Sequence, residues 1–329
     1  MYKAGVIGCR GIGIAHAIGI ISSDRARLAA ACDLDEATLR EFEQRWPDEN
    51  PTLYRDHREM LAREALDIVT VATSDHRHAD LVVDAANAGA KGIFCEKPLA
   101  TNLADADRMI AACDTNNTTL SVDHTRRFIP LWRYAKEEIV DQGVIGPVQY
   151  VIGTLSGPRA MLFRNGTHTL DAICYYAGEQ PQWVVAELEE GYEDYAEYRG
   201  DGGHVPATEP GANGYIHFSG GVRGFYIGGS KTTPAPKQQL EVVGTTGRLV
   251  MVSDGGTLYR GEEPEPLAPP TWPVEGIPAG IHELIAAIDQ GVESVSPGRA
   301  GHTVVELIIG FLESQKQGNV PVPIPVPRG

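Results

Sequence analysis

Short apolar runs alternate with amphipathic stretches between Lys3 and about Asp123. The runs read AGVIG, LAAACD, DIVTVAT, KGIFCE and TLSVDH, and the residues between them have helical spacing. This alternation is typical of βαβ units, in which parallel strands form one sheet that helices cover. We therefore predict an α/β domain with a parallel sheet over residues 1–122.

The pattern changes after Asp123. A helix is expected over 130–142, and longer alternating runs such as PVQYVIGTLSG and NGYIHFSGGVRGFYIGGS follow it. Such alternation predicts an antiparallel sheet with one buried face. Helices over 277–290 and 299–317 and a proline-broken edge strand or tail over 320–327 close the chain. A second, α+β domain is thus predicted over 123–329, which agrees with two cores in 329 residues.

The charge balance narrows the range of partners. The chain has 28 Lys and Arg residues against 44 Asp and Glu residues, a formal charge of -16. This charge repels nucleic acids and anionic membranes, so we expect neither as a partner. The N-terminus has no signal-peptide pattern, no run approaches the roughly 20 apolar residues of a bilayer span, and the five cysteines show no CxxC pairing. We expect a reduced, cytoplasmic protein.

The first strand-to-helix turn reads GCRGIG over residues 8–13. Its outer glycines occupy the first and third positions of the G-x-G-x-x-G dinucleotide-binding pattern, while the middle glycine is displaced by one position. Asp33 ends the second strand 20 residues after Gly13, where a carboxylate can bind the adenosine ribose. The turn residues expected to contact the dinucleotide are Gly8, Arg10, Gly11, Ile12 and Gly13.

A simpler interpretation is that the glycines only form a turn and Asp33 caps the next helix. The register of strand, turn, helix and acid favours cofactor binding over this interpretation. Because Asp33 would repel a 2'-phosphate, we predict NAD in preference to NADP. Arg10 leaves room for NADP, since its guanidinium could meet a phosphate or stack on adenine.

Several segments together resemble the Gfo/Idh/MocA family, the glucose-fructose oxidoreductase and inositol dehydrogenase family. They are residues 73–78 (TSDHRH), 95–100 (CEKPLA), 124–128 (HTRRF), 165–171 (NGTHTLD) and 320–325, besides the glycine turn and Asp33. The resemblance implies a Rossmann domain followed by a domain built on a large, mostly antiparallel sheet. It also implies hydride transfer to or from a secondary alcohol or ketone of a sugar, sugar acid or cyclitol.

The resemblance assigns roles by position. Lys97 is similar to the catalytic lysine of the family and His168 to the histidine that meets the reacting hydroxyl. Pro98 corresponds to the residue after an often cis peptide bond. Further cofactor contacts are expected from Thr73, Ser74, His76, His78, Glu96 and Lys97. Substrate contacts are expected from Lys97, Arg127, Arg164, Asn165 and His168.

The chemistry of alcohol oxidation agrees with these residue types. The hydroxyl proton must leave as the hydride departs, and a lysine accepts it when its pKa falls well below the ordinary value of about 10.4. No metal is expected, because a lysine can do this work and His168 has no second His or Cys at ligand spacing. His76 and His78 are expected to line a turn near the nicotinamide. Cys95 is interpreted as a small buried hydrophobe.

One departure from the family concerns Arg164. Many sugar and inositol dehydrogenases of this family have an aspartate four residues before the histidine. An arginine there favours an anionic substrate such as a uronic acid, because its donors match a carboxylate bidentately. The alternative is that Arg164 turns outward and pairs with a surface acid.

Two other functions stay open at this point. A redox-assisted glycosidase or lyase would use NAD transiently and accumulate no NADH. A cofactor-binding sensor would keep the fold without the chemistry, although Lys97 and His168 argue against it. We also expect a homo-oligomer, a dimer or a tetramer, because an open sheet over 214–252 leaves an apolar face uncovered.

Overall fold

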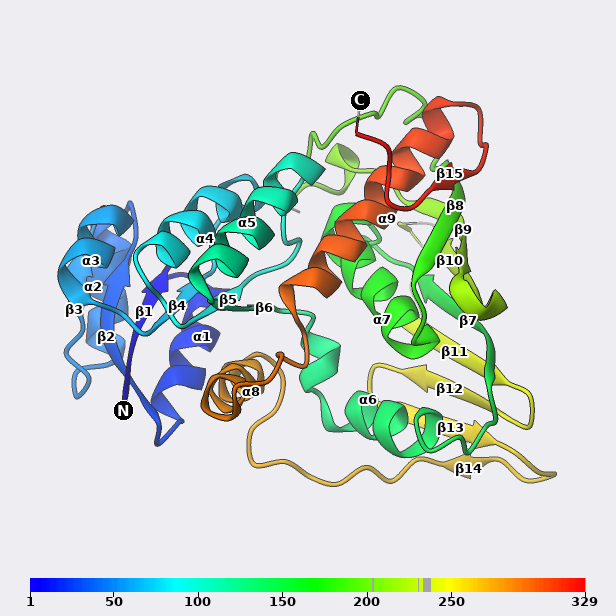
Figure 1. The fold of residues 1–329 in the computed structure, drawn as a ribbon, viewed down its shortest axis with the longest axis horizontal. Helices are drawn as coiled ribbons and strands as arrows, with labels where there is room; N and C mark the ends of the chain where they lie inside the picture. Colours follow the sequence, from blue (N-terminus) through cyan, green and yellow to red (C-terminus); the bar gives the residue numbers. More distant parts are fainter. Residues whose placement is uncertain (203, 230, 233–237, 329) are drawn as a thin grey trace. The chain divides into compact units, whose positions relative to one another are not determined.

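A computed structural model describes residues 1–202, 204–229, 231–232 and 238–328 (Figure 1). The chain divides into two compact units. The first comprises Met1–Phe128 and Pro273–His302, and the second comprises Ile129–Trp272 and Thr303–Gly329. No helix in the described ranges combines the length and apolar character needed to cross a membrane.

The first unit holds a parallel sheet of six strands in the order β3-β2-β1-β4-β5-β6, counted over the described residues. The strands are β1 (Tyr2–Ile7), β2 (Ala26–Cys32), β3 (Thr52–Tyr54), β4 (Ile68–Val71), β5 (Gly92–Cys95) and β6 (Thr119–Val122). The strand order reverses between β1 and β4. In a sheet of this kind ligands bind beyond the carboxyl ends of the strands at that reversal.

Helices connect these strands. They are α1 (Ile12–Ile21), α2 (Glu36–Arg45), α3 (His57–Glu64), α4 (His78–Asn87) and α5 (Leu103–Asn116). Two short 3-10 segments, η1 (Asp75–Arg77) and η2 (Thr125–Phe128), follow β4 and β6. The predicted α/β domain with a parallel sheet is therefore confirmed.

Helix α8 (Ile277–Gln290) belongs to the first unit, although it lies about 150 residues further along the chain. Its apolar face, including Ile281 and Leu284, is buried in the same core as Val6 and Phe94. Gly19 of α1 leaves room for this contact, since a Cβ there would lie 2.7 Å from Ile281 Cγ1. The sequence analysis placed residues 273–302 in the second domain, because nothing local indicates which core an apolar helix joins.

The boundary between the units also lies later than the expected 122/123. Phe128, in η2, is fully buried in the first core, and its ring lies 6.0 Å from that of Phe94. The chain therefore leaves the first unit only after this aromatic contact.

The second unit is built on a sheet whose described strands have the order β14-β13-β12-β11-β7-β10-β9-β8-β15. The pair β7 and β10 is parallel and the other neighbouring pairs are antiparallel. The strands are β7 (Val148–Leu155), β8 (Pro181–Leu188), β9 (Ala212–Phe218), β10 (Arg223–Gly228), β11 (Gln238–Gly244), β12 (Arg248–Val252), β13 (Gly255–Tyr259), β14 (Glu265–Pro266) and β15 (Val322–Pro323). The predicted mostly antiparallel sheet is confirmed.

One face of this sheet packs against helices of its own unit (Figure 1). A Cβ on Gly153 would lie 2.6 Å from Thr169 of α7 (Thr167–Ala177), and one on Gly214 would lie 2.2 Å from Phe311 of α9 (Gly298–Lys316). The glycines thus let both helices approach the strands closely. The expected helix over 130–142 is present as α6 (Pro130–Tyr134) followed by a π-helical segment, η3 (Ala135–Val140).

The packing of α8 yields a test of the unit boundary. We expect Ile281→Ala to lower the free energy of unfolding by about 2–5 kcal/mol, because it opens a cavity in the first core. Denaturant unfolding followed by circular dichroism measures this loss. Leu34→Ala, at a position 81% exposed, serves as the control. A loss below about 0.5 kcal/mol for Ile281→Ala would contradict the assignment of α8 to this core.

Candidate active site

The glycine turn after β1 leaves no space for side chains at two positions. Gly8 has φ +91°, and a Cβ there would lie 2.2 Å from the Ala72 carbonyl oxygen beyond β4. A Cβ on Gly13 would lie 1.8 Å from the Gly8 carbonyl oxygen. Both contacts are far below van der Waals distance, so this turn requires glycine at each position.

Helix α1 begins at Ile12 directly after Gly11. No side chain caps it, and its first turn contains no acidic residue. The positive end of the helix dipole is therefore available to an anion, as in dinucleotide-binding turns. The turn fits the pyrophosphate of a nicotinamide dinucleotide.

Asp33 is held beside this turn by two backbone amides. Its Oδ2 accepts a hydrogen bond from Cys9 N at 2.9 Å, and its Oδ1 accepts one from Asp35 N at 3.0 Å. Each carboxylate oxygen has a further lone pair that can accept a ribose hydroxyl. Asp33 therefore has a fixed orientation at the end of β2.

The Arg10 side chain is engaged on helix α2. Its Nε donates to Thr38 Oγ1 at 2.5 Å, and its Nη2 forms an ion pair with Asp35. The guanidinium therefore has a carboxylate partner at the start of α2, in a pair whose side chains are 72% and 47% exposed.

Contacts of His78 link the residues after β4 to the turn after β5. Thr73 and Ser74 precede η1, His76 is exposed within it, and His78 begins α4. His78 is fully buried, with Nδ1 2.9 Å from the Pro98 carbonyl oxygen and Nε2 3.3 Å from the Thr73 carbonyl oxygen. Burial lowers the pKa of His78, so the ring is neutral at pH 7 and donates one of these hydrogen bonds.

That His78 lines a turn near the nicotinamide stays a prediction. Its ring nitrogens face carbonyl groups of the chain itself. The residue connects two loops of the site and has its side chain turned inward. The sequence does not show this, because Pro98 lies 20 residues away.

Glu96 and Lys97 directly follow β5 and are both buried, at 8% and 7% exposure. The Glu96 amide extends the sheet by donating to the Val71 carbonyl oxygen at 2.9 Å. The Lys97–Pro98 peptide bond is cis, as the family resemblance implied. Lys97 therefore lies at the carboxyl edge of the sheet, in the same unit as the glycine turn.

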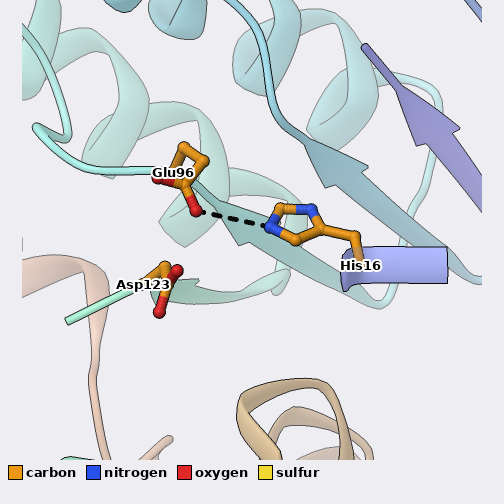
Figure 2. A group of neighbouring side chains, drawn as sticks. All are labelled: His16, Glu96 and Asp123. Carbon is orange, nitrogen blue, oxygen red and sulfur yellow. Dashed lines mark ion pairs between the residues drawn. The ribbon is translucent and has the colours of Figure 1, made fainter. Parts of the chain in front are cut away.

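His16, Glu96 and Asp123 form a buried polar cluster behind this edge (Figure 2). His16 Nε2 lies 3.4 Å from Glu96 Oε1, and Asp123 Oδ1 accepts a hydrogen bond from the Thr125 hydroxyl at 3.0 Å. Burial lowers the pKa of His16 to about 4, and burial together with the charge of Glu96 raises the pKa of Asp123 well above its usual range. The cluster has donor types found in metal sites, with ligand atoms within 4.8 Å of one another.

Sequence reasoning missed His16 and Asp123. Asp123 was detectable in principle, because β5 and β6 are neighbours and the residues that follow them share one edge of the sheet. His16 had no comparable signal, since a histidine within a helix is commonly part of a core.

Cys95 is fully buried at the end of β5. Burial, with the nearby Glu96 charge, raises the pKa of its thiol well above the ordinary value. It is therefore not a thiolate at neutral pH, which agrees with its interpretation as a core residue.

The remaining candidate substrate residues are divided between the two units. Arg127, in the first unit, is buried and donates from Nη1 to the Val295 carbonyl oxygen at 2.8 Å. Arg164 and Asn165 lie in a π-helical segment, η4 (Leu162–Gly166), and His168 is the second residue of α7 in the second unit.

A second arginine lies near Arg164. Burial and then the charge of Arg164 lower the pKa of Arg159. Two guanidinium groups therefore share one part of the second unit. Arg159 was not identified from the sequence, because no motif includes it.

Comparison with known families bears on this arrangement. The family described as "Oxidoreductase family, NAD-binding Rossmann fold" matches residues 2–124, and the one described as "Oxidoreductase family, C-terminal alpha/beta domain" matches residues 137–324. The chain belongs to the Gfo/Idh/MocA oxidoreductase family. It is accordingly an oxidoreductase with an NAD-binding Rossmann domain, and the resemblance found in the sequence is confirmed.

Individual relatives agree with this assignment. The chain is 32% identical to myo-inositol 2-dehydrogenase from Thermotoga maritima over 258 residues, 75% of this chain and 74% of that protein. It is 29% identical to D-apiose dehydrogenase from Paraburkholderia graminis over 344 residues, 96% and 88% of the two chains. Among solved structures, aldose-aldose oxidoreductase from Caulobacter crescentus, complexed with glycerol, has a TM-score of 0.82 at 20% identity, covering 98% and 99% of the chains.

Proposed function

We propose that this protein transfers a hydride between NAD and a secondary alcohol or ketone carbon of a sugar, sugar acid or cyclitol. The observation that carries the proposal is the buried Lys97 at the carboxyl edge of a sheet whose first turn accommodates a dinucleotide. The names of the similar proteins, which act on myo-inositol, D-apiose and aldoses, support the substrate class.

The proposed chemistry assigns Lys97 the hydroxyl proton. NAD, when bound, supplies the hydride acceptor. Lys97 Nζ takes the proton of the alcohol during oxidation and returns it during reduction, and burial favours the neutral amine that accepts it. We assign His168 to the reacting hydroxyl from the family resemblance. Asn165 and Arg127 are proposed as further substrate contacts.

Replacing Lys97 tests this role. Lys97→Met should reduce turnover by about a hundredfold to ten-thousandfold, the usual contribution of a positioned base, while NADH affinity stays within about twofold. Turnover is measured as NADH formation on a panel of myo-inositol, aldoses and uronic acids, and affinity by NADH fluorescence. The exposed Lys91→Met is the control. Turnover of Lys97→Met within a few-fold of the parent would remove Lys97 from the mechanism.

We further propose that NAD is preferred to NADP. The oriented carboxylate of Asp33 can accept ribose hydroxyl bonds and repels a phosphate dianion. Arg10, the residue that left room for NADP, is paired with Asp35 and bonded to Thr38. The contacts of both residues therefore support the same cofactor.

Titration with each reduced cofactor tests the preference. NADH should bind at least about tenfold more tightly than NADPH, a difference of about 1.4 kcal/mol. Arg10→Ala should leave this ratio unchanged within about twofold if Asp33 sets it. If the parent binds NADPH as tightly as NADH or more tightly, and Arg10→Ala loses this NADPH binding, then Arg10 governs the choice of cofactor.

We propose that Arg164 favours an anionic substrate. The neighbouring Arg159 supports this, because two guanidinium groups in one region attract a carboxylate more strongly than one. A sugar acid such as a uronic acid then suits the site better than the neutral sugar.

Matched pairs of sugars test the charge preference. Arg164→Asp should lower kcat/KM for D-glucuronate or D-galacturonate about tenfold or more relative to D-glucose or D-galactose, as expected for the loss of a charge-assisted hydrogen bond. Arg27→Asp, at an exposed position on β2 in the other unit, is the control. An equal effect on acidic and neutral sugars would return the substrate proposal to neutral polyols.

Finally, we propose a homo-oligomer, a dimer or a tetramer, that pairs through the second sheet. The side chains opposite the helix-covered face include aromatic ones that are partly exposed. The rings of Trp183 and His217 are stacked with their centroids 5.0 Å apart, and the ring centroids of Tyr215 and Phe225 lie 5.5 Å apart. A face of this composition is typical of an interface.

Light scattering at micromolar concentration should give at least twice the 35.5 kDa chain mass, and a monomer would contradict the proposal.

A further inference from the structure

Segment η4 carries Arg164 and Asn165, two of the proposed substrate contacts. It is five residues long, and the amides of Arg164, Asn165 and Gly166 all donate to the Met161 carbonyl oxygen, at 3.2, 3.2 and 2.9 Å. A single turn of this kind is too short to be stable by itself. The positions of Arg164 and Asn165 therefore depend on contacts from outside the segment.

The first two amides of η4 are held by residues just before β9. Leu162 N donates to the Pro210 carbonyl oxygen at 2.9 Å, and Phe163 N donates to Glu209 Oε2 at 3.1 Å. Amides at the start of a helical segment have no acceptor within it, and a carboxylate is a strong acceptor for them. Glu209 thus caps η4 from a position 46 residues further along the chain.

Glu209 is fully buried. The loop before it covers the carboxylate closely, since a Cβ on Gly200 would lie 2.5 Å from Glu209 Oε1. The Tyr198 ring of this loop lies edge-on to the Phe163 ring, with the centroids 4.9 Å apart. A hydrogen bond to a buried carboxylate is stronger than one in water, and its loss costs more. The bond to the Phe163 amide is therefore well suited to fix the start of η4.

The main chain of Glu209 is itself anchored. Lys231 Nζ donates to the Glu209 carbonyl oxygen at 2.6 Å and pairs with Glu189 Oε2 at 2.7 Å. The same Glu189 oxygen accepts the Gly211 amide at 2.9 Å. The carboxylate of Glu209 thus extends from a backbone that is held on both sides.

Close packing fixes the other end of η4. A Cβ on Gly166 would lie 2.8 Å from the Tyr226 hydroxyl oxygen on β10. His168 follows in α7, where Thr169 packs on Gly153 of β7. Glu209 is therefore the side chain that holds the start of η4, whereas the sheet holds its end.

We propose that Glu209 is a positioning residue for substrate binding, whose carboxylate holds η4 in the conformation in which Arg164 and Asn165 contact the substrate. Glu209 acts through the Phe163 amide and does not touch the substrate. The role in substrate binding rests on the proposed function, whereas the anchoring of η4 is independent of it.

Two substitutions at Glu209 test this role in the full chain. Glu209→Ala removes the acceptor and should raise KM for the sugar about tenfold. Its kcat should stay within about threefold and its NADH affinity within about twofold, because Lys97 and the dinucleotide turn belong to the first unit. Glu209→Gln keeps an oxygen that can accept the Phe163 amide, so its KM should stay within about threefold of the parent. The substrate is the member of the sugar and cyclitol panel that the parent oxidises fastest.

Glu306 of α9 provides a matched control in the same unit. It is buried, and its Oε2 also accepts a backbone amide, that of Val326 at 2.7 Å. Glu306→Ala should lower the stability to denaturant as Glu209→Ala does, because each loses a buried acceptor. Its KM should nevertheless stay within about twofold of the parent.

Hydrogen exchange followed by mass spectrometry measures the anchor directly. A peptide that contains the Phe163 amide should exchange at least about tenfold faster in Glu209→Ala than in the parent and in Glu306→Ala. If Glu209→Ala does not fold, Glu209→Asp takes its place. Its carboxylate is one methylene shorter, so it should show the same rise in KM and in exchange.

Each result supports or overturns a defined part. Unchanged exchange at Phe163 overturns the anchor. A parent-like KM in the variant that lacks the acceptor, an equal rise in Glu209→Gln, or an equal rise in Glu306→Ala overturns the positioning role. If Lys97→Met keeps its turnover, the proposed function fails, and the exchange of the Phe163 amide still decides the anchor.

Discussion

The close approach of Gly13 to the Gly8 carbonyl oxygen determines how helix α1 lies against strand β1. No residue with a Cβ fits there, and Gly8 is equally restricted by the Ala72 carbonyl oxygen. This approach brings the uncapped N-terminus of α1 to the turn, where an anion can bind. It also places His16, one turn further along α1, next to Glu96. The dinucleotide turn and the polar cluster thus depend on the same backbone contact.

Several buried polar groups of the first unit lie at the carboxyl edge of its sheet. Glu96 and Asp123 follow adjacent parallel strands, and His78 connects the loops after β4 and β5. Burying such groups costs free energy unless they bond to one another. The contacts of His78 with the carbonyl oxygens of Thr73 and Pro98 offset part of that cost and connect the loop after β4 to the turn that contains Lys97.

Local patterns in the sequence were sufficient to predict the architecture. Strand and helix alternation predicted both sheets, and the spacing of Gly8, Gly13 and Asp33 predicted the turn, because each depends on residues close together in the chain. The position of α8 could not be predicted, since its apolar face fits either core and only the three-dimensional contact with α1 decides it.

The site was predicted only in part for a related reason. Lys97 was found through a motif of consecutive residues. The contact of His78 with Pro98 joins residues from separate parts of the chain. The cluster of His16 with Glu96 and Asp123 does so too. Side chains that meet only through the fold leave no periodic signal, although the carboxyl ends of neighbouring strands are where such meetings are expected.

Isotope transfer tests the central claim most directly. A sugar or cyclitol of the oxidised class, deuterated at its secondary carbinol carbons, is incubated with NAD and the enzyme, and the nicotinamide product is analysed by mass spectrometry. We predict net reduced cofactor that carries one deuterium. Turnover of the substrate with no reduced cofactor accumulating, or with no deuterium in it, would contradict a dehydrogenase and indicate redox-assisted elimination or no hydride transfer.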